Sequence, residues 1–243
     1  PYSVDGRTEQ LVYLSQVGDL AAYEELRSGF TAAVSHELRT PLARLLSLLE
    51  LALLPGEDVT ELVDSARREV EQIRELIDEV LFLSELESGA RVVSLGATAI
   101  MPVLHEVVAD LEERSARAGV TLSVAGDEGA AVEVRPRMLR VVAQNLAENA
   151  LRYAGPGTTA TLSVERGPAE AILTVADDGA GVSEADLPRL FERFYRTDRS
   201  RASRGTGLGL AIVKHVVSSA GGTVEALGGP GRGLEVRCRF PAR

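Results

Sequence analysis

Two long stretches of the chain carry apolar residues three or four positions apart, which is the spacing of one face of an α-helix. The first runs from about residue 20 to residue 54, where Pro55-Gly56 ends it. The second runs from Val59 to Glu87. Its apolar positions alternate spacings of four and three and are Val59, Val63, Ala66, Val70, Ile73, Ile77 and Val80. This heptad stripe predicts a helical hairpin that pairs with a second copy in a four-helix bundle. A monomeric hairpin packed on the rest of the chain is the alternative.

The pattern changes after Gly89, where helical and strand-like segments begin to alternate. Apolar and polar residues alternate at Thr158–Val164, Glu170–Ala176 and Leu234–Phe240, which predicts three strands. Helical spacing predicts helices over about 99–118, 136–153, 184–194 and 208–220. The predicted fold class is therefore α+β, with the dimeric helical hairpin followed by an α/β sandwich that holds a mixed sheet.

These changes of pattern divide the chain into three predicted segments. Residues 1–18 come first, residues 19–90 form the helical hairpin, and residues 91–243 form the α/β part. Within the first segment, residues 10–17 are rich in apolar and β-branched side chains and predict a short strand.

Composition and charge narrow the classes of function. The 243 residues carry a formal net charge of −10, which repels the phosphate backbone of nucleic acid and argues against it as a partner. The single cysteine, Cys238, excludes an internal disulfide. Because no run of about 18 uncharged apolar residues occurs, we expect no direct membrane contact within these residues.

His36 lies in the segment SHELRTPL, inside the first predicted helix. It stands two positions from Val34 and two from Leu38, which places it opposite the apolar stripe and exposes it. Glu37 can accept the proton of one ring nitrogen and thereby leave the other as a nucleophile. Pro41 cannot donate a hydrogen bond to the carbonyl of Glu37, so the helix is looser one turn after the histidine.

A second group of polar residues occurs in NLAENALRY, residues 145–153. Asn145 and Asn149 are four positions apart and share one helix face, and Arg152 adds a cation on the next turn. Neutral oxygen ligands beside a cation suit a magnesium ion and phosphate groups. An incidental pair of helical asparagines is the alternative.

The segment VADDGAGV, residues 175–182, ends a predicted strand in Asp177. Gly179 and Gly181 permit tight backbone turns close to a ligand. A carboxylate at this corner could accept hydrogen bonds from the amino group of adenine. A plain Asp-Gly turn is the other interpretation.

Glycines alternate in GTGLGLAIV, residues 205–213, immediately before a predicted helix. Backbone N–H groups and a helix N-terminus can therefore face phosphates at this point. The segment is not a dinucleotide-binding fingerprint, because the charged stretch 196–204 precedes it where that motif needs a strand.

Taken in order, these motifs resemble those of one family, the two-component sensor histidine kinases. SHELRTPL resembles the H box, NLAENALRY the N box, DDGAGV the G1 box, FERFYR (residues 191–196) the F box and GTGLGL the G2 box. The resemblance covers about residues 20–243. It implies a dimerisation and histidine-phosphotransfer hairpin, followed by an ATP-binding domain similar to those of gyrase, Hsp90 and MutL. Residues 1–18 would then be the end of an upstream, PAS-like sensor.

The resemblance also implies a role for each motif, with ATP and Mg²⁺ as cofactors. His36 would accept the phosphoryl group with Glu37 as its base, and Asn149 would hold the magnesium ion. Asp177 would bind the adenine, and residues 195–206 would form a mobile lid. The nucleotide-binding set implied in this way is Asn145, Asn149, Arg152, Tyr153, Asp177, Gly179, Gly181, Gly205, Thr206, Gly207, Leu208 and Gly209.

The implied activity is autophosphorylation of His36, transfer to an aspartate in the receiver domain of a response regulator, and dephosphorylation of that regulator. Thr40 lies one turn after His36, where its hydroxyl could position a water molecule for the last step; bonding back to the carbonyl of His36 is the alternative. The implied partners are a second copy and the regulator. The implied location is the cytoplasm, and the resemblance allows a membrane anchor elsewhere in the full-length protein.

Two other functions compete with this interpretation. An ATPase or serine kinase of the gyrase-like superfamily would not need SHELRTPL on a heptad hairpin. A scaffold that only dimerises would not need the nucleotide motifs, and a measurement of ATP binding separates it from a kinase.

Overall fold

The structure is a computed structural model that describes residues 2–4, 7–9, 17–87, 92–197 and 205–241. Its helices are α1 (Val17–Leu51), α2 (Val59–Glu87), α3 (Ile100–Asp110), α4 (Glu112–Ala118), α5 (Pro136–Tyr153), the short 3₁₀ helix η1 (Leu187–Arg189) and α6 (Gly209–Ser219). Its strands are β1 (Tyr2–Val4), β2 (Arg7–Glu9), β3 (Val93–Ala99), β4 (Thr121–Gly126), β5 (Ala131–Val134), β6 (Thr159–Arg166), β7 (Glu170–Asp177), β8 (Thr223–Gly228) and β9 (Leu234–Pro241). None of the helices in this described part is both long and apolar enough to cross a membrane.

The chain forms two compact units that divide between Thr40 and Pro41, inside α1. The first unit contains the antiparallel pair β1–β2 and the part of α1 that carries His36. Pro41 lacks the N–H that would bond to the carbonyl of Glu37, so the helix loses one backbone bond at this boundary. The predicted strand at residues 10–17 lies outside the described residues except for Val17, which begins α1.

The second unit includes α2, whose bounds match the predicted helix. Asp58 caps its start, because Oδ1 accepts hydrogen bonds from the N–H groups of Thr60 and Glu61 at 2.9 and 3.2 Å. Two apolar faces run along the helix. The face that carries Leu76, Leu83 and Leu86 is buried, with at most 3% of each residue exposed. The predicted heptad stripe is largely exposed in the single chain, where its exposed members are Val59, Val63, Val70 and Ile77.

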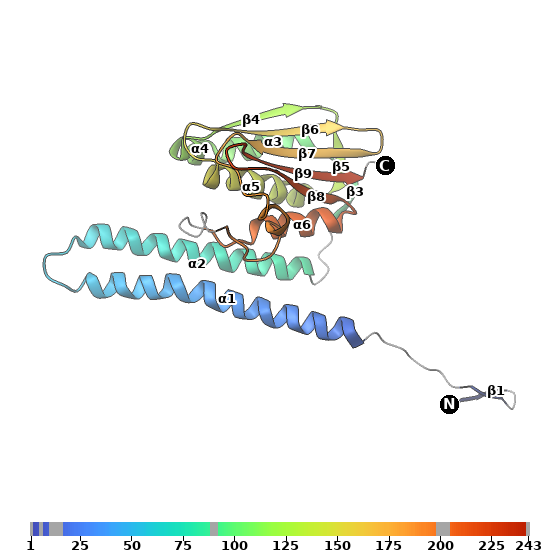
Figure 1. Cartoon of the computed structure of the whole chain (residues 1–243), viewed down its shortest axis with the longest axis horizontal. Helices are drawn as coiled ribbons and strands as arrows, with labels where there is room; N and C mark the ends of the chain where they lie inside the picture. The colour runs from blue at the N-terminus through green and yellow to red at the C-terminus, as the bar shows by residue number, and fades with distance from the viewer. Residues whose placement is uncertain (1, 5–6, 10–16, 88–91, 198–204, 242–243) are drawn as a thin grey trace. The chain divides into compact units, whose positions relative to one another are not determined.

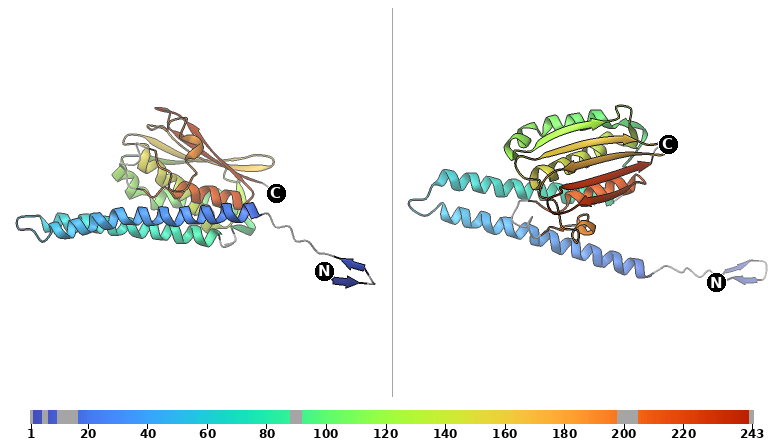
Figure 2. Two further views of the ribbon diagram at one scale, coloured as in Figure 1. Left: turned by 60° about the horizontal axis from the view of Figure 1, so that its bottom comes forward. Right: turned by 45° about the horizontal axis from the view of Figure 1, so that its top comes forward.

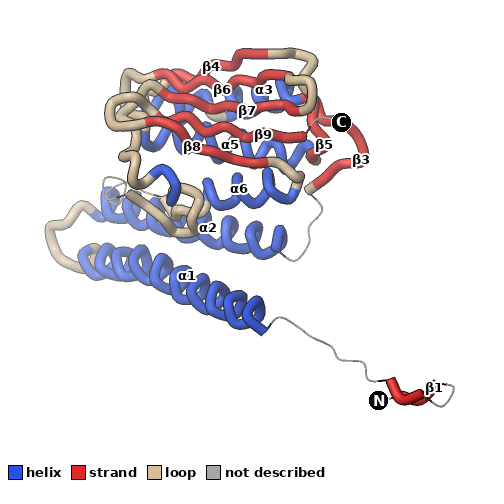
Figure 3. Tube along the Cα trace, turned by 45° about the vertical axis from the view of Figure 1, so that its right-hand side comes forward, coloured by secondary structure: helices blue, strands red, loops and turns tan. Residues whose placement is uncertain are grey.

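The second unit contains a five-stranded sheet in the order β4-β6-β7-β9-β8 (Figures 1 and 3). Strands β4 and β6 are parallel and the other neighbours are antiparallel, so the predicted mixed sheet is confirmed. Helices α3, α5 and α6 cover one face of this sheet, as both views in Figure 2 show. The smaller pair β3–β5 is antiparallel.

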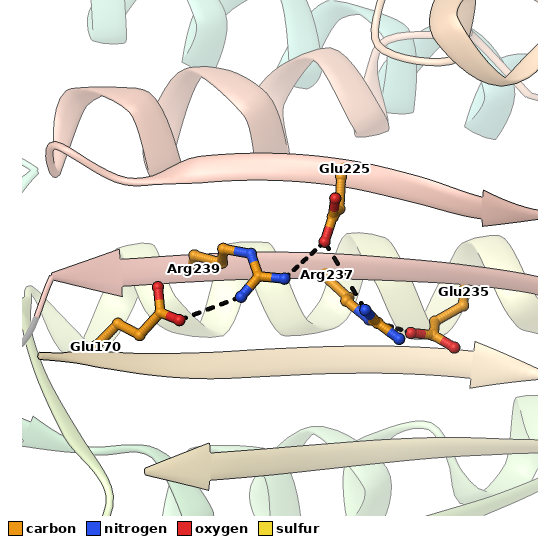
Figure 4. A network of polar contacts seen from close by, with 5 residues as sticks. All are labelled: Glu170, Glu225, Glu235, Arg237 and Arg239. Atoms are coloured by element: carbon orange, nitrogen blue, oxygen red, sulfur yellow. Dashed lines mark hydrogen bonds and ion pairs between the residues drawn. The ribbon is translucent and has the colours of Figure 1, made fainter. Parts of the chain in front are cut away.

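The two faces of the sheet differ because side chains alternate along each strand. On the helix-covered face, Leu173, Val236 and Cys238 are buried, and burial raises the pKa of the Cys238 thiol to about 12. The opposite face carries a network of ion pairs in which Arg239 contacts Glu170 and Glu225 at 3.1 and 2.8 Å (Figure 4). Arg237 and Glu235 extend the same network.

Three sequence predictions need correction. The predicted helix at 184–194 is reduced to η1, and Phe194 adopts a positive φ of 60° that no α-helix contains. The predicted helix at 99–118 is interrupted at Leu111, which separates α3 from α4. Strands β3, β4, β5 and β8 were not predicted, and β4 has intermediate or exposed residues throughout, so it lacks the alternation that marks a half-buried strand.

Candidate functional site: a polar pocket beside α5 and an exposed histidine

Helix α5 supplies one wall of a pocket in the second unit. Pro136 occupies its first turn, where a missing N–H has no cost. Its buried residues recur at helical spacing and are Met138, Leu139, Val142, Ala143, Leu146, Ala147 and Ala150. That packing leaves Asn145, Asn149 and Arg152 partly exposed on a neighbouring face, where all three line the pocket. The amide of Asn145 donates to the carbonyl of Val141 at 2.8 Å, which fixes its orientation.

Asp177 is the last residue of β7 and lines the same pocket as the polar residues of α5. Its Oδ1 accepts hydrogen bonds from the N–H groups of Gly179 at 2.9 Å and Leu234 at 3.4 Å. Burial raises the pKa of this carboxyl, and the two N–H bonds partly offset that effect. Both bonds use Oδ1, so Oδ2 can accept a hydrogen bond from a ligand in the pocket.

The glycine-rich segment leads directly into α6. Thr206 is 7% exposed, and its hydroxyl accepts a hydrogen bond from the N–H of Leu208, which satisfies one donor at the start of the helix. Gly209 begins α6 so close to α5 that an added Cβ would lie 2.6 Å from Oδ1 of Asn145. A larger residue at 209 would therefore displace the asparagine, so glycine at this position allows α5 and α6 to pack closely at the site.

The pocket brings together nine of the twelve residues of the nucleotide-binding set. Its lining residues are Glu79, Asn145, Glu148, Asn149, Arg152, Tyr153, Asp177, Gly181, Val182, Leu190, Tyr195, Arg196, Thr197, Thr206, Gly207, Gly209, Leu210 and Leu234. Gly179, Gly205 and Leu208 do not line it. Gly179 packs on the backbone of Ala154 and Leu208 is fully buried, so both support the pocket from behind. The predicted lid, 195–206, is described only at its two ends, and residues 198–204 lie outside the described part.

Sequence reasoning missed six lining residues. Val182, Leu190, Leu210 and Leu234 add apolar surface, and each resembles an ordinary core residue in the sequence. Glu148 lies between the two asparagines of the N-box segment, and this position could have indicated that it lines the pocket. Glu79 comes from α2, more than sixty positions before any other lining residue, and only the folded chain reveals it.

His36 belongs to the first unit. Its side chain is 75% exposed, in agreement with its predicted place opposite the apolar stripe. Nδ1 lies 3.5 Å from Oε1 of Glu37, so a proton on Nδ1 faces that carboxylate while Nε2 remains open to solvent. Thr40 is also exposed. The neighbouring Ser35 bonds back to the carbonyl of Thr31 at 2.8 Å, and no such backbone bond of Thr40 is present among the described residues.

Two family models match the chain. The model described as "Histidine kinase-, DNA gyrase B-, and HSP90-like ATPase" matches residues 111–243, which is more than half of the chain. The model described as "His Kinase A (phospho-acceptor) domain" matches residues 26–89, which contain His36.

Individual proteins give the same result. The sensor-like histidine kinase SenX3 of Mycolicibacterium smegmatis is 32% identical over 242 residues, which cover 98% of this chain and 63% of the relative. The chain therefore spans less than two thirds of this relative's length. Among solved structures, ShkA in complex with AMPPNP is 28% identical with a TM-score of 0.63, covering 86% of this chain and 45% of that one. ThkA in complex with the response regulator TrrA is 20% identical with a TM-score of 0.74, covering 94% and 68%.

The pocket beside α5, the exposed histidine on α1 and the two consecutive family matches lead to one assignment: the chain belongs to the two-component sensor histidine kinases and carries both their phosphoacceptor domain and their ATPase-like domain.

Proposed function

We propose that this chain is the core of a protein histidine kinase that uses ATP to phosphorylate His36 and then passes the phosphoryl group to an aspartate of a response regulator. The observation that carries the proposal is the pocket in which Asn149, Arg152 and Asp177 meet the start of α6. An amide oxygen, a cation, a half-buried carboxylate and a helix N-terminus are the groups that a magnesium-bound nucleotide needs. ShkA, which is 28% identical, was solved with AMPPNP and supports this ligand class.

Each group has a separate task in the proposed site. The carboxylate of Asp177 accepts a hydrogen bond from the amino group of adenine. Arg152 and the N–H groups at the start of α6 neutralise the phosphates, and Tyr153 contacts the nucleotide. Asn149 would hold Mg²⁺, which would supply neutralisation of the phosphate charge. Asn145 keeps α5 and α6 in register beside it.

The proposed reaction begins at the imidazole of His36. Nδ1–H faces Glu37, so Nε2 holds the free lone pair and attacks the γ-phosphorus. The Nε2–P bond forms as the bond between phosphorus and the ADP oxygen breaks, and ADP leaves. The Nδ1 proton moves toward Glu37. In the second step a carboxylate oxygen of the regulator attacks phosphorus, the Nε2–P bond breaks, and the proton on Glu37 returns to Nδ1, which restores the neutral imidazole.

Two partners follow from this proposal. The exposed heptad stripe of α2 suits a second copy of the chain, because apolar side chains at that spacing bury each other in a four-helix bundle. The second partner is a response regulator, as in the ThkA–TrrA structure, which shares the fold. We place the reaction in the cytoplasm, where ATP is available.

The test is incubation of the purified chain with radiolabelled ATP, followed by mapping of the label. We expect an acid-labile, base-stable label on the wild type and none on His36→Gln. Glu57→Gln is a matched control, since it changes an exposed side chain in the turn before α2. A label that persists on His36→Gln would overturn the assignment.

A further inference from the structure

The second half of α2 packs against other elements of the second unit, the unit that also holds the pocket. Leu76, Leu83 and Leu86 are buried, and α2 contacts α6. The ring of Phe82 lies 5.9 Å from the guanidinium of Arg137, at the start of α5. This face of α2 is therefore occupied within one chain, whereas the heptad stripe on its other face stays exposed.

Glu79 lies on the packed face, three positions after Leu76 and four before Leu83, and its side chain reaches the nucleotide pocket. Its Oε2 accepts a hydrogen bond from the hydroxyl of Thr206. The same hydroxyl accepts the N–H of Leu208 at the start of α6. Glu79 is thus attached to the segment that the proposed function assigns to the phosphates.

The carboxyl of Glu79 has charged neighbours of both signs. Burial raises the pKa of its carboxyl to about 7, and the Thr206 hydroxyl and the attraction of Arg152 partly offset that rise. The charged groups that face it are Arg152 and Glu148 on α5 and Glu75 on α2 itself. A carboxylate in this place attracts the cation that the phosphates need, and it repels the phosphates themselves.

We propose that Glu79 acts as a counter-anion in the nucleotide pocket: it accepts a hydrogen bond from Thr206 and attracts Arg152 when the pocket is empty, and the phosphates of the nucleotide must displace it. The inference rests on the proposed function, because it requires a triphosphate in this pocket. Its consequence is reciprocal coupling, in which nucleotide binding loosens the packing of α2 and the packing of α2 weakens nucleotide binding.

The first experiment measures binding of Mg·AMP-PNP and of adenosine by calorimetry. Glu79→Gln removes the charge and keeps the shape, so AMP-PNP affinity should rise at least about 5-fold, the lower end of ordinary coupling between two sites. Adenosine has no phosphates and should bind both proteins equally. Asp78→Asn is the matched control, since it removes the same charge from the exposed neighbouring residue and should leave both affinities unchanged.

The pH dependence gives a second readout. Above about pH 7 Glu79 is ionised and opposes the phosphates, and below it the carboxyl is protonated and neutral. The advantage of Glu79→Gln over wild type should therefore be larger at about pH 8 than at about pH 6. The titration of the ligand's own phosphates cancels in this ratio, because both proteins bind the same ligand.

A third readout uses the wild type alone and does not depend on folding of the variant. AMP-PNP should increase backbone hydrogen exchange in residues 76–86, whereas adenosine should not. Equal AMP-PNP affinity of wild type and Glu79→Gln, or unchanged exchange in this segment, would overturn the inference. Failure of the wild type to bind any adenine nucleotide would instead reject the proposed function.

Discussion

Asp177 is the residue whose chemistry is most specific to one part of the proposed ligand. Replacing it by Asn removes the charge but keeps an oxygen that can accept the N–H groups of Gly179 and Leu234. Loss of a charge-assisted hydrogen bond, about 1.5–3 kcal/mol, should weaken nucleotide binding roughly 10- to 150-fold. Calorimetry with AMP-PNP measures the change. Asp178→Asn, which alters the exposed neighbour, is the control, and equal losses in both variants would contradict the assignment.

The raised pKa of Asp177 also predicts an effect on stability. Burial favours the protonated form of the Asp177 carboxyl in the folded chain. Its contribution to folding stability is therefore fully present below the pKa that this carboxyl has in the unfolded chain, and it is lost as pH rises through the higher pKa of the folded chain. At neutral pH the ionised carboxylate therefore costs stability. Asp177→Asn should unfold at the same temperature as wild type or higher, even though it binds nucleotide poorly. A lower unfolding temperature at neutral pH would count against this sign.

Thr40 permits a test that separates two activities at one residue. Its exposed hydroxyl lies one turn after His36, where it can position a water molecule to attack an aspartyl phosphate on a docked regulator. In the proposed reaction, autophosphorylation uses His36, Glu37 and ATP but not this hydroxyl. Thr40→Ala should slow regulator dephosphorylation about 10-fold or more and change autokinase activity little. The measurements are phosphate loss from a purified phospho-regulator and the autokinase rate; a matching fall in both would refute the role.

The site residues that could be predicted from the sequence share one property: residues close to them along the chain indicate their role. Asn149 has Asn145 one turn before it and Arg152 one turn after it, and Asp177 is followed by two glycines. The residues that escaped prediction have no such neighbours. Leu210 and Leu234 look like core positions, and Glu79 looks like any charged residue on a long helix.

At the scale of elements, the two apolar faces of α2 predict two separate contacts. Val70 belongs to the exposed heptad stripe and is 51% exposed in the single chain. Val70→Glu should place like charges together in a dimer and shift the protein to monomers at micromolar concentration, as measured by sedimentation. Glu71→Lys, an exposed change off the stripe, should leave the dimer intact. A wild type that is already monomeric would reject the dimer itself.

The elements also show which patterns determine structure. The bounds of α2 and α5 followed from apolar spacing, because each helix carries a continuous apolar face along its length. Strands β6, β7 and β9 followed from clean alternation, because only one face of the sheet is covered by helices. Strand β4 pairs with β6 alone, and residues 184–194 form turns around the short helix η1, so neither has the burial pattern on which such a prediction depends.

At the scale of the whole molecule, the two units should respond differently to nucleotide. A ligand that binds only the folded form at 100 times its Kd adds about 2.7 kcal/mol of stability. Because all pocket residues belong to the unit 41–243, AMP-PNP should raise the unfolding temperature of that unit and slow hydrogen exchange in α5 and α6. Exchange around His36 should stay unchanged. The same experiment with Asp177→Asn is the control, because a roughly 10- to 150-fold weaker affinity should reduce the ligand-induced stabilisation to about half or less of the wild-type value.

The burial of Cys238 has a practical consequence for such experiments. Thiol reagents react with the thiolate, and a thiol with a pKa of about 12 at the centre of a sheet presents almost none of it at neutral pH. Since this is the only cysteine of the chain, the native protein should not react with such reagents, and the unfolded protein should react once per chain. Its reaction rate therefore reports opening of the sheet. A cysteine introduced on the surface would be the single labelled site, so probes can be attached to either unit without first replacing Cys238.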